Sequence, residues 1–454
     1  MVIRKIISLT IIFLFLSIQN ASCAKLSLQE AINMALSQNT DILITQKNED
    51  TANAELRRAK GENAFSATAD SSIDINKTES SPHVKTQSNR ISGSFPIYTG
   101  GKNEASIKNS EIAIKSYKLQ TERQCENLKL NVIQTYYDAI QARETIKIRQ
   151  EAVDNYEAHY INVDQLYYAG TKARVDVLRA SVELSNAKYE LISAQNDYEL
   201  RLATLRNYLN IDRNEPLELT DDFIYNQFST PLIECIDYAY NHRKDLLVDL
   251  YNLQQKELAI KIAKAGFLPS VNFSIGANLT GNNSTSWDMT PDMSTGVSVS
   301  WNIFDMGVTR AQINAAKTER DIAQLNFNKD KENIDLALRE HYYNMRRAES
   351  QLHSTYDAIK QAEEDYFIAK EKYRVGEGIM LDVLDAQKSL SESRLNYITA
   401  QYDYLRYKAA LENAMGISLT QNELEAAYSI TSKVLESIDL HNTINNMEKY
   451  IKNR

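Results

Sequence analysis

Two hydrophobic periods alternate along the chain and predict two β-hairpins. Between 270 and 280, apolar and polar residues alternate strictly, and after a polar loop the return segment does the same as far as Ile303. A two-residue period places every second side chain on one face of a strand. The sequence therefore predicts a hairpin at 269–304 and, from a weaker copy of the pattern around Ile73, Ile91 and Phe95, a hairpin at 66–98.

A long helix is predicted after each hairpin. The segments 102–169 and 308–375 contain no Pro and no Gly, and at about 1.5 Å per residue each would form a helix on the order of 100 Å long. Return helices are predicted at 172–210 and 379–415, where residues recur at steps of three and four. A stripe of this kind is the seam of a neighbouring antiparallel helix, so we interpret its residues as packing residues.

The chain is a tandem duplication. Shifted by 206 residues, positions 169–211 match 375–417 at 16 of 43 places without a gap. We therefore predict two structural repeats, 25–226 and 227–417, each with a short helical region, a hairpin, a long helix and a return helix. The remaining segment, 418–454, is expected either to pack around the middle of the helical part or to form a mobile tail.

The first residues have the pattern of an export signal. Arg4 and Lys5 precede an apolar stretch at 6–18, and small residues suited to cleavage follow, so 1–24 is predicted to be a signal peptide. Cys23 could instead be the lipidated residue of a lipoprotein. The remaining thiols, Cys125 and Cys235, are too few and too far apart for a disulfide framework.

Composition narrows the possible functions. The 454 residues carry 51 Lys and Arg against 60 Asp and Glu, and the resulting net charge of -9 argues against nucleic acid as a partner. A mean hydropathy of -0.44 argues against a bundle of membrane helices. The six histidines are scattered without metal-ligand spacing, and acids, bases and nucleophiles form no recognisable set. We expect no catalytic residue, no metal and no cofactor, and hence no enzyme.

The two hairpins have a pattern typical of outer-membrane β-strands, with apolar residues on one face and aromatic residues such as Trp301 near the ends. Four strands cannot close a sheet on themselves, and open edges are excluded from lipid, so the chain would have to oligomerise. Two copies would give a side-chain-filled barrel, whereas three would leave room for water. The alternatives are a soluble amphipathic hairpin and a coiled-coil scaffold without a pore.

Several motifs in this order resemble the TolC-type outer-membrane efflux proteins. The resemblance covers about 25–417 and rests on the export signal, on Leu26 to Ala31, and on a helix tip that occurs twice. The first tip reads Tyr167-x-x-Gly170-x5-Asp176-Val177, and the second reads Tyr373-x-x-Gly376-x5-Asp382-Val383-Leu384-Asp385-Ala386. The chain departs from the family at Thr40, Lys244 and Phe65, where the family often has proline.

The resemblance implies a mainly α fold with transmembrane β structure. Long antiparallel helices would form a periplasmic α-barrel, and four strands per chain would contribute to a 12-stranded outer-membrane β-barrel in a homotrimer. Such a channel gives passive exit to substrates in multidrug efflux or type I protein secretion. The implied partners are a periplasmic adaptor protein, an inner-membrane pump or ABC exporter, and outer-membrane lipid.

The resemblance also points to particular residues. The helix tips, expected to dock the adaptor, comprise Gly170, Thr171, Val375, Gly376 and Glu377. The periplasmic gate would include Asp382 and Asp385, as stacked rings of carboxylates, together with Tyr373 and Asp176.

One member of the family has an arginine where this chain has Gly378, and Lys172 is a candidate substitute at the equivalent place in the first repeat. Asp176 could instead cap its helix or pair with Arg179. A tip glycine that ends a helix in a left-handed cap has the same sequence signature as a docking turn.

Overall fold

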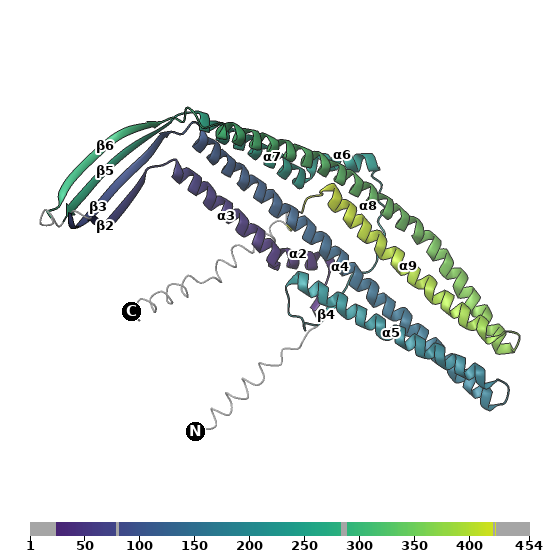
Figure 1. The fold of residues 1–454 in the computed structure, drawn as a ribbon. Coiled ribbons are helices and arrows are strands. Elements are labelled where there is room, and N and C mark those ends of the chain that lie inside the picture. Colours follow the sequence, from purple (N-terminus) through teal and green to yellow (C-terminus); the bar gives the residue numbers. More distant parts are fainter. Residues whose placement is uncertain (1–23, 79–80, 283–287, 421–422, 424–454) are drawn as a thin grey trace, which may run out of the picture. The chain divides into compact units, whose positions relative to one another are not determined.

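The computed structural model describes residues 24–78, 81–282, 288–420 and 423 (Figure 1). Cys23, nearly all of the predicted signal peptide and most of 418–454 lie outside the described residues. The described part consists of long helices and one four-stranded sheet, together with a two-stranded pairing of short segments. The predicted mainly helical fold with a smaller β component is confirmed.

The helices and strands follow the order expected of a duplicated chain. The helices are α2 (Leu28–Gln38), α3 (Thr40–Glu62), α4 (Lys102–Tyr168), α5 (Arg174–Leu209), α6 (Leu232–His242), α7 (Lys244–Lys264), η1 (Ala265–Phe267), α8 (Val308–Val375) and α9 (Met380–Met415). The strands are β1 (Ala24–Leu26), β2 (Ser66–Thr78), β3 (Ser81–Tyr98), β4 (Leu217–Leu219), β5 (Ser270–Asn282) and β6 (Thr290–Ser300).

The two hairpins join in one antiparallel sheet of order β2-β3-β5-β6. The pairing aligns the apolar positions of all four strands: Ala69 faces Ile91, Ile91 faces Ala277, and Ala277 faces Met293. Ile73, Ile91 and Val297 on this apolar face are more than half exposed. An apolar face left open on an isolated sheet indicates a surface that is covered by something other than water.

The second hairpin is shorter than its alternating pattern. β6 ends at Ser300, although the alternation continues through Trp301 and Ile303. Ser300 pairs with Ser270, the first residue of β5, so the ladder has no partner for the residues that follow. Instead, the Trp301 indole N–H donates to the Phe267 carbonyl at 3.0 Å.

The described residues divide into two compact units that do not coincide with the sequence repeats. One unit comprises residues up to 43 together with 124–242 and 334 onwards, and the other comprises 44–123 and 243–333. Each unit therefore takes residues from both repeats. The second unit contains the four-stranded sheet and a helical core in which Ala105 and Ile112 of α4 pack with Leu258 of α7.

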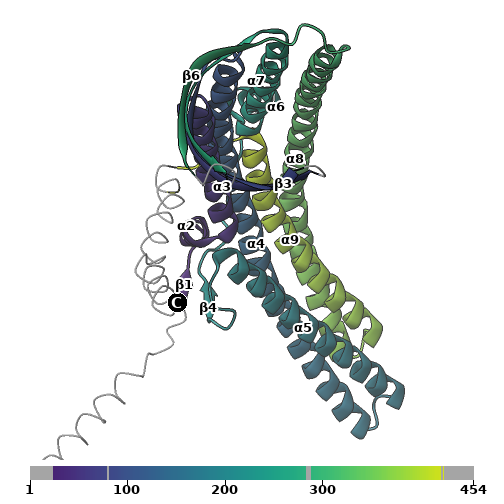
Figure 2. The same ribbon diagram turned by 60° about the vertical axis from the view of Figure 1, so that its left-hand side comes forward.

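The first unit has the larger apolar core. α4 contributes Tyr136 and Ile140, α5 contributes Leu205 and Leu209, and α2 contributes Leu36; all five are completely buried or nearly so. Within this unit α5 runs alongside α4, and α9 runs alongside α8 (Figure 2). Among the described helices, none has an apolar stretch long enough to cross a bilayer.

Candidate gate at the helix tips

Each helical hairpin of the first unit ends in a tight turn built around a glycine. Gly170 follows α4 with a φ of +78°, and Gly376 follows α8 with a φ of +86°, a left-handed conformation that side chains other than glycine rarely adopt. The Thr171 amide and hydroxyl both donate to the Leu166 carbonyl at 2.9 Å, and the Glu377 amide donates to the Lys372 carbonyl at 2.9 Å. Both turns are therefore glycine C-caps that satisfy the last carbonyls of their helix.

The second turn has no room for a side chain at Gly378. A Cβ atom there would lie 2.9 Å from the Tyr373 backbone nitrogen and 3.1 Å from the Lys372 carbonyl carbon. Both contacts are with backbone, which cannot move aside as a flexible side chain could. In this conformation the turn excludes the arginine that one relative carries at the position of Gly378.

The tips are held together by a small core drawn from four helices. Val163 of α4, Ala180 of α5, Tyr373 of α8 and Val383 of α9 are all buried there, and Met380 packs with them. The small residues allow the helices to approach closely, and Tyr373 is the largest of the buried side chains in this core.

Tyr373 lies close to two other residues that the sequence analysis selected, Lys172 and Asp176. The Lys172 ammonium lies over the Tyr373 ring, 4.5 Å from its centroid. Burial raises the pKa of the Tyr373 phenol, and the nearby Asp176 carboxylate raises it further. Lys172 and Asp176 belong to the first helical hairpin and Tyr373 to the second, so this cluster joins the two.

Neither alternative role of Asp176 is present in the described part of the chain. The N-cap position of α5 is occupied by Ala173, with no side-chain cap, and Asp176 forms no ion pair with Arg179. Asp176 is half-buried, three residues inside the helix, and its carboxylate lies close enough to Tyr373 to influence that phenol.

His159 of α4 is part of the same cluster, although no motif in the sequence pointed to it. Its ring packs against Tyr373 with the two centroids 5.5 Å apart. Burial lowers the pKa of His159, and the positive charge of Lys370 lowers it further, so the neutral imidazole is favoured. In the described structure the His159 Nε2 and the Tyr373 hydroxyl are both buried and accept or donate no hydrogen bond.

The two aspartates after the second turn differ in their surroundings. Asp382 and Asp385 are both exposed on the first two turns of α9. Burial raises the pKa of Tyr156 on α4 to about 12, with smaller contributions from two glutamates on α5, from Tyr366 and, last, from Asp385. Asp385 therefore lies near Tyr156 of the other helical hairpin.

All five residues expected at the docking tips are exposed: Gly170, Thr171, Val375, Gly376 and Glu377. At the same turns the structure also exposes two apolar residues that the sequence analysis did not select: Tyr168 is 82% exposed and Ile379 is 60% exposed. Large apolar side chains at an exposed turn are a frequent mark of a protein-binding surface.

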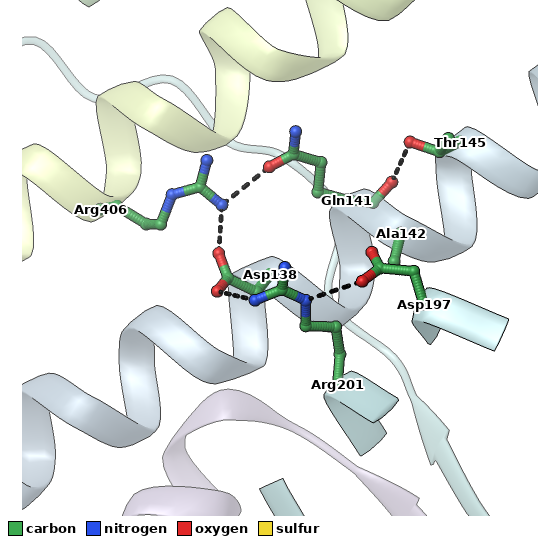
Figure 3. Close-up of a pocket in the computed structure, with 7 residues that line it drawn as sticks. All are labelled: Asp138, Gln141, Ala142, Thr145, Asp197, Arg201 and Arg406. Atoms are coloured by element: carbon green, nitrogen blue, oxygen red, sulfur yellow. Dashed lines mark hydrogen bonds and ion pairs between the residues drawn. The ribbon is translucent and has the colours of Figure 1, made fainter. Parts of the chain in front are cut away.

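Farther along the same unit, an ion-pair network joins α4, α5 and α9 around a recess of about 280 Å³ (Figure 3). Asp138 of α4 binds Arg406 of α9 at 2.5 Å and Arg201 of α5 at 3.2 Å. Arg406 also donates to Gln141 at 2.8 Å, and Arg201 pairs with Asp197 at 3.4 Å. Because every charge here has an opposite partner, the network is a structural connection between helices.

Within the described residues, no group of three or more His, Cys, Asp and Glu side chains is arranged to hold a metal ion. The titratable cluster at the tips contains a cation, a phenol, an imidazole and a carboxylate around a packed core. Its contacts join helices of the two helical hairpins.

Comparison with known proteins identifies the family that the sequence and the fold match. Residues 31–210 and 235–417 match the family described as outer membrane efflux protein. The chain is 22% identical to a probable efflux pump outer membrane protein, TtgC of Pseudomonas putida, over 86% of this chain and 83% of that protein. It is 21% identical to the outer membrane protein TolC of Escherichia coli, over 72% of this chain and 68% of TolC.

Among solved structures, the CmeC outer membrane channel of Campylobacter jejuni superposes with a TM-score of 0.79 at 19% identity, covering 89% of this chain and 88% of CmeC. The matched segments of the family include both hairpins, both long helices and both tips. The chain belongs to the outer membrane efflux protein family, whose members are channels of the outer membrane with a helical tunnel in the periplasm, and not enzymes.

Proposed function

We propose that the chain forms a homotrimeric channel-tunnel that gives passive exit to substrates delivered by an inner-membrane transporter through a periplasmic adaptor. The observation that carries the proposal is the four-stranded sheet, which has one largely apolar face and, among the described strands, β2 and β6 at its open edges. In lipid such edges need partners, and three copies would supply twelve strands around a lumen wide enough for water.

The tips are the proposed periplasmic gate. Lys172, Asp176 and Tyr373 connect the two helical hairpins of one chain, so breaking their contacts would favour separation of the hairpins. Lys172 would take the place of the arginine that the turn at Gly378 excludes. Asp382 and Asp385 are exposed on α9, and threefold symmetry would arrange them as two rings of carboxylates that attract cations.

The adaptor is proposed to dock on the turns at Gly170 and Gly376. The exposed Tyr168, Val375 and Ile379 would supply apolar contacts, and Glu377 a charge at the rim. The named relative from Pseudomonas putida belongs to an efflux pump, which supports an inner-membrane pump as the third component. Type I secretion through an ABC exporter is the other assignment that the same architecture serves.

The gate is tested by single-channel recording of the purified full chain in planar bilayers. Lys172→Ala removes a cation–π contact of about 1 kcal/mol, which corresponds to an about fivefold larger open population and a raised mean conductance. Asp176→Ala is expected to act in the same direction. Arg179→Ala is the matched control, because this exposed cation lies on α5 with Asp176 and, in the described structure, forms no ion pair with it.

The outcomes separate the parts of the proposal. Equal conductance of Lys172→Ala, Asp176→Ala and the wild type would contradict the gate assignment while leaving the pore intact. An absence of any wild-type conductance, or a detergent-independent monomer on ultracentrifugation, would contradict the channel itself. Increased susceptibility to dyes and antibiotics in a deletion strain supports efflux, whereas loss of one secreted polypeptide supports type I secretion.

A further inference from the structure

The polar face of the four-stranded sheet contains one row of charged residues that crosses all four strands. Asp70 on β2 pairs with Arg90 on β3, Arg90 pairs with Asn278 on β5, and Asn278 pairs with Asp292 on β6. Residues in cross-strand register lie on the same face, so these four side chains form a continuous line across the sheet.

The neighbouring rows on the same face contain only hydroxyl groups and glycine. On one side the row consists of Thr68, Ser92, Gly276 and Ser294, and on the other it consists of Ser72, Ser88, Thr280 and Thr290. The charges are thus concentrated at one level along the strands. One further carboxylate on this face, Asp74, lies opposite Thr86 and accepts a hydrogen bond from Ser72 at 3.4 Å.

The hydroxyl rows bond across the strands, whereas the two oppositely charged residues do not bond each other. The Thr68 and Ser92 hydroxyls are 2.8 Å apart, and the Ser88 hydroxyl donates to Asn278 at 3.0 Å. In the described strands, Asp70 and Arg90 are direct neighbours but form no ion pair with each other. An explanation of the row as a cross-strand ion pair that stabilises the sheet is therefore not supported by its geometry.

Arg90 extends toward the other hairpin, over a glycine. One of its guanidinium nitrogens lies 3.9 Å from the place where a Cβ atom of Gly276 would stand. The hydroxyl of Ser294, which pairs with Gly276 on β6, lies 3.3 Å from the same point. Both Asp70 and Arg90 are exposed, so their charged groups are accessible from the polar side of the sheet.

We infer that this row is a charge-selectivity ring in the lumen of the β-barrel, and this inference depends on the trimeric barrel proposed above. With the apolar face toward lipid, the polar face lines the aqueous lumen. Three copies would place six carboxylates and three guanidiniums in one band of the lumen, with a net negative charge. A ring of this kind favours inorganic and organic cations over anions, independently of the aspartates at the helix tips.

The test is the reversal potential of the full-length channel in a planar bilayer under a KCl gradient. The background carries Asp382→Asn and Asp385→Asn, so that the carboxylates at the tips no longer determine selectivity. Asp70→Asn combined with Asp292→Asn is expected to lower the potassium-to-chloride permeability ratio by about twofold or more, and Arg90→Gln to raise it by a similar factor.

Lys85→Gln is the matched control. Lys85 lies on β3 five residues from Arg90, pairs with Ile75, and therefore points to the apolar face. Removing its positive charge is expected to leave the permeability ratio unchanged. A similar change in the permeability ratio from Lys85→Gln and Arg90→Gln, or no change from the double aspartate variant, would contradict the ring. In either case the measured conductance would still support the pore. No conductance from the wild type would overturn the pore and the ring together.

A second readout does not depend on ion selectivity. Arg90→Cys is expected to react with a cationic methanethiosulfonate several-fold faster than with an anionic one, and the reaction should reduce the conductance. The native Cys125 and Cys235 are buried, and Lys85→Cys reports the opposite face. Equal rates with the two reagents, or reduction of the conductance through Lys85→Cys alone, would contradict the assignment.

Discussion

The two helix tips occupy equivalent places in the duplicated sequence but have different surroundings. Tyr167 and Tyr373 are separated by the repeat length of 206 residues, yet Tyr167 is 37% exposed and Tyr373 is 6% exposed. The ring of Tyr373 is covered by Lys172 and His159, both from the other hairpin. The duplication produced two tips with similar sequences. Only Tyr373 of the second tip is buried where the two tips meet.

The two tips also differ in their charged residues. Lys172 and Arg179 in the first repeat correspond to Gly378 and Asp385 in the second. The first tip thus provides cations, while the second provides a tight turn and an additional carboxylate. Opposite charges on the two tips suit a contact between unlike partners, which two identical tips could not form in this way.

The largest expected effect distinguishes the two equivalent tyrosines. Tyr373→Ala removes a buried ring from the four-helix core and should destabilise the tips by about 3 to 4 kcal/mol. Tyr167→Ala removes a partly exposed ring and should change stability by less than about 1 kcal/mol. Native-state hydrogen exchange of the amides in 366–386 measures the opening free energy of this region.

The control variant for this comparison is Tyr373→Phe, because the Tyr373 hydroxyl has no hydrogen-bond partner in the described structure. It should retain most of the protection, since the packed ring remains. Equal loss of protection in Tyr373→Ala and Tyr167→Ala would show that the difference in burial has no energetic consequence.

An intermediate effect is expected at the next pair of equivalent positions. Gly378→Ala places a Cβ atom 2.9 Å from a backbone nitrogen, and such overpacking should destabilise the second turn by about 1 to 3 kcal/mol. Lys172→Ala should destabilise the tips by about 0.5 to 1 kcal/mol through loss of the cation–π contact. The same hydrogen-exchange measurement, restricted to 370–380, compares the two.

Lys172→Arg serves as the control here, because a guanidinium can also lie over an aromatic ring and should keep the protection. A Gly378→Ala variant as stable as the wild type would mean that the turn can rearrange. The arginine of the relative could then be accommodated at this position, and Lys172 would not be needed as its substitute.

The fold could be predicted largely from the absence of helix breakers and from the two-residue period. α8 occupies Val308–Val375, the long run without Gly or Pro, because nothing in that run interrupts its hydrogen bonds. The end of β6 could not be predicted, because alternation continues through Trp301 while the ladder stops where its partner strand begins. A pattern along one strand contains no information about the length of its neighbour.

The candidate site was only partly accessible to sequence reasoning. Tyr373, Asp176 and Lys172 were selected through the repeated tip motif and the family resemblance, and they remain proposed gate residues. His159 is a lone histidine with no ligand spacing, and its importance depends on how α4 packs against α8. That packing is a tertiary property, and neither the repeat nor the helical period specifies it.

The smallest expected effect concerns this histidine and the pH. The pKa of His159 is lowered from its usual 6.5 by burial and by Lys370. The packed tips therefore bind fewer protons than the opened tips, and stability rises with pH wherever the opened state binds more protons. Protection of the tips should be complete above about pH 6.5 and should decline as the pH falls toward the lowered pKa.

The pH effect sharpens the comparison because the repeat-equivalent position is occupied by an exposed aspartate, Asp365, and not by a buried histidine. Hydrogen exchange in 155–175 and 366–376, measured at pH 7.5 and pH 5.5 and corrected for intrinsic exchange, is the direct test. His159→Gln should remove most of the pH dependence in these segments, because glutamine does not titrate. His341, whose pKa is also lowered by burial, lies elsewhere on α8, so His341→Gln should leave the tips unaffected. If His159→Gln retains the wild-type pH dependence, another group at the tips titrates, and His159 has only a packing role.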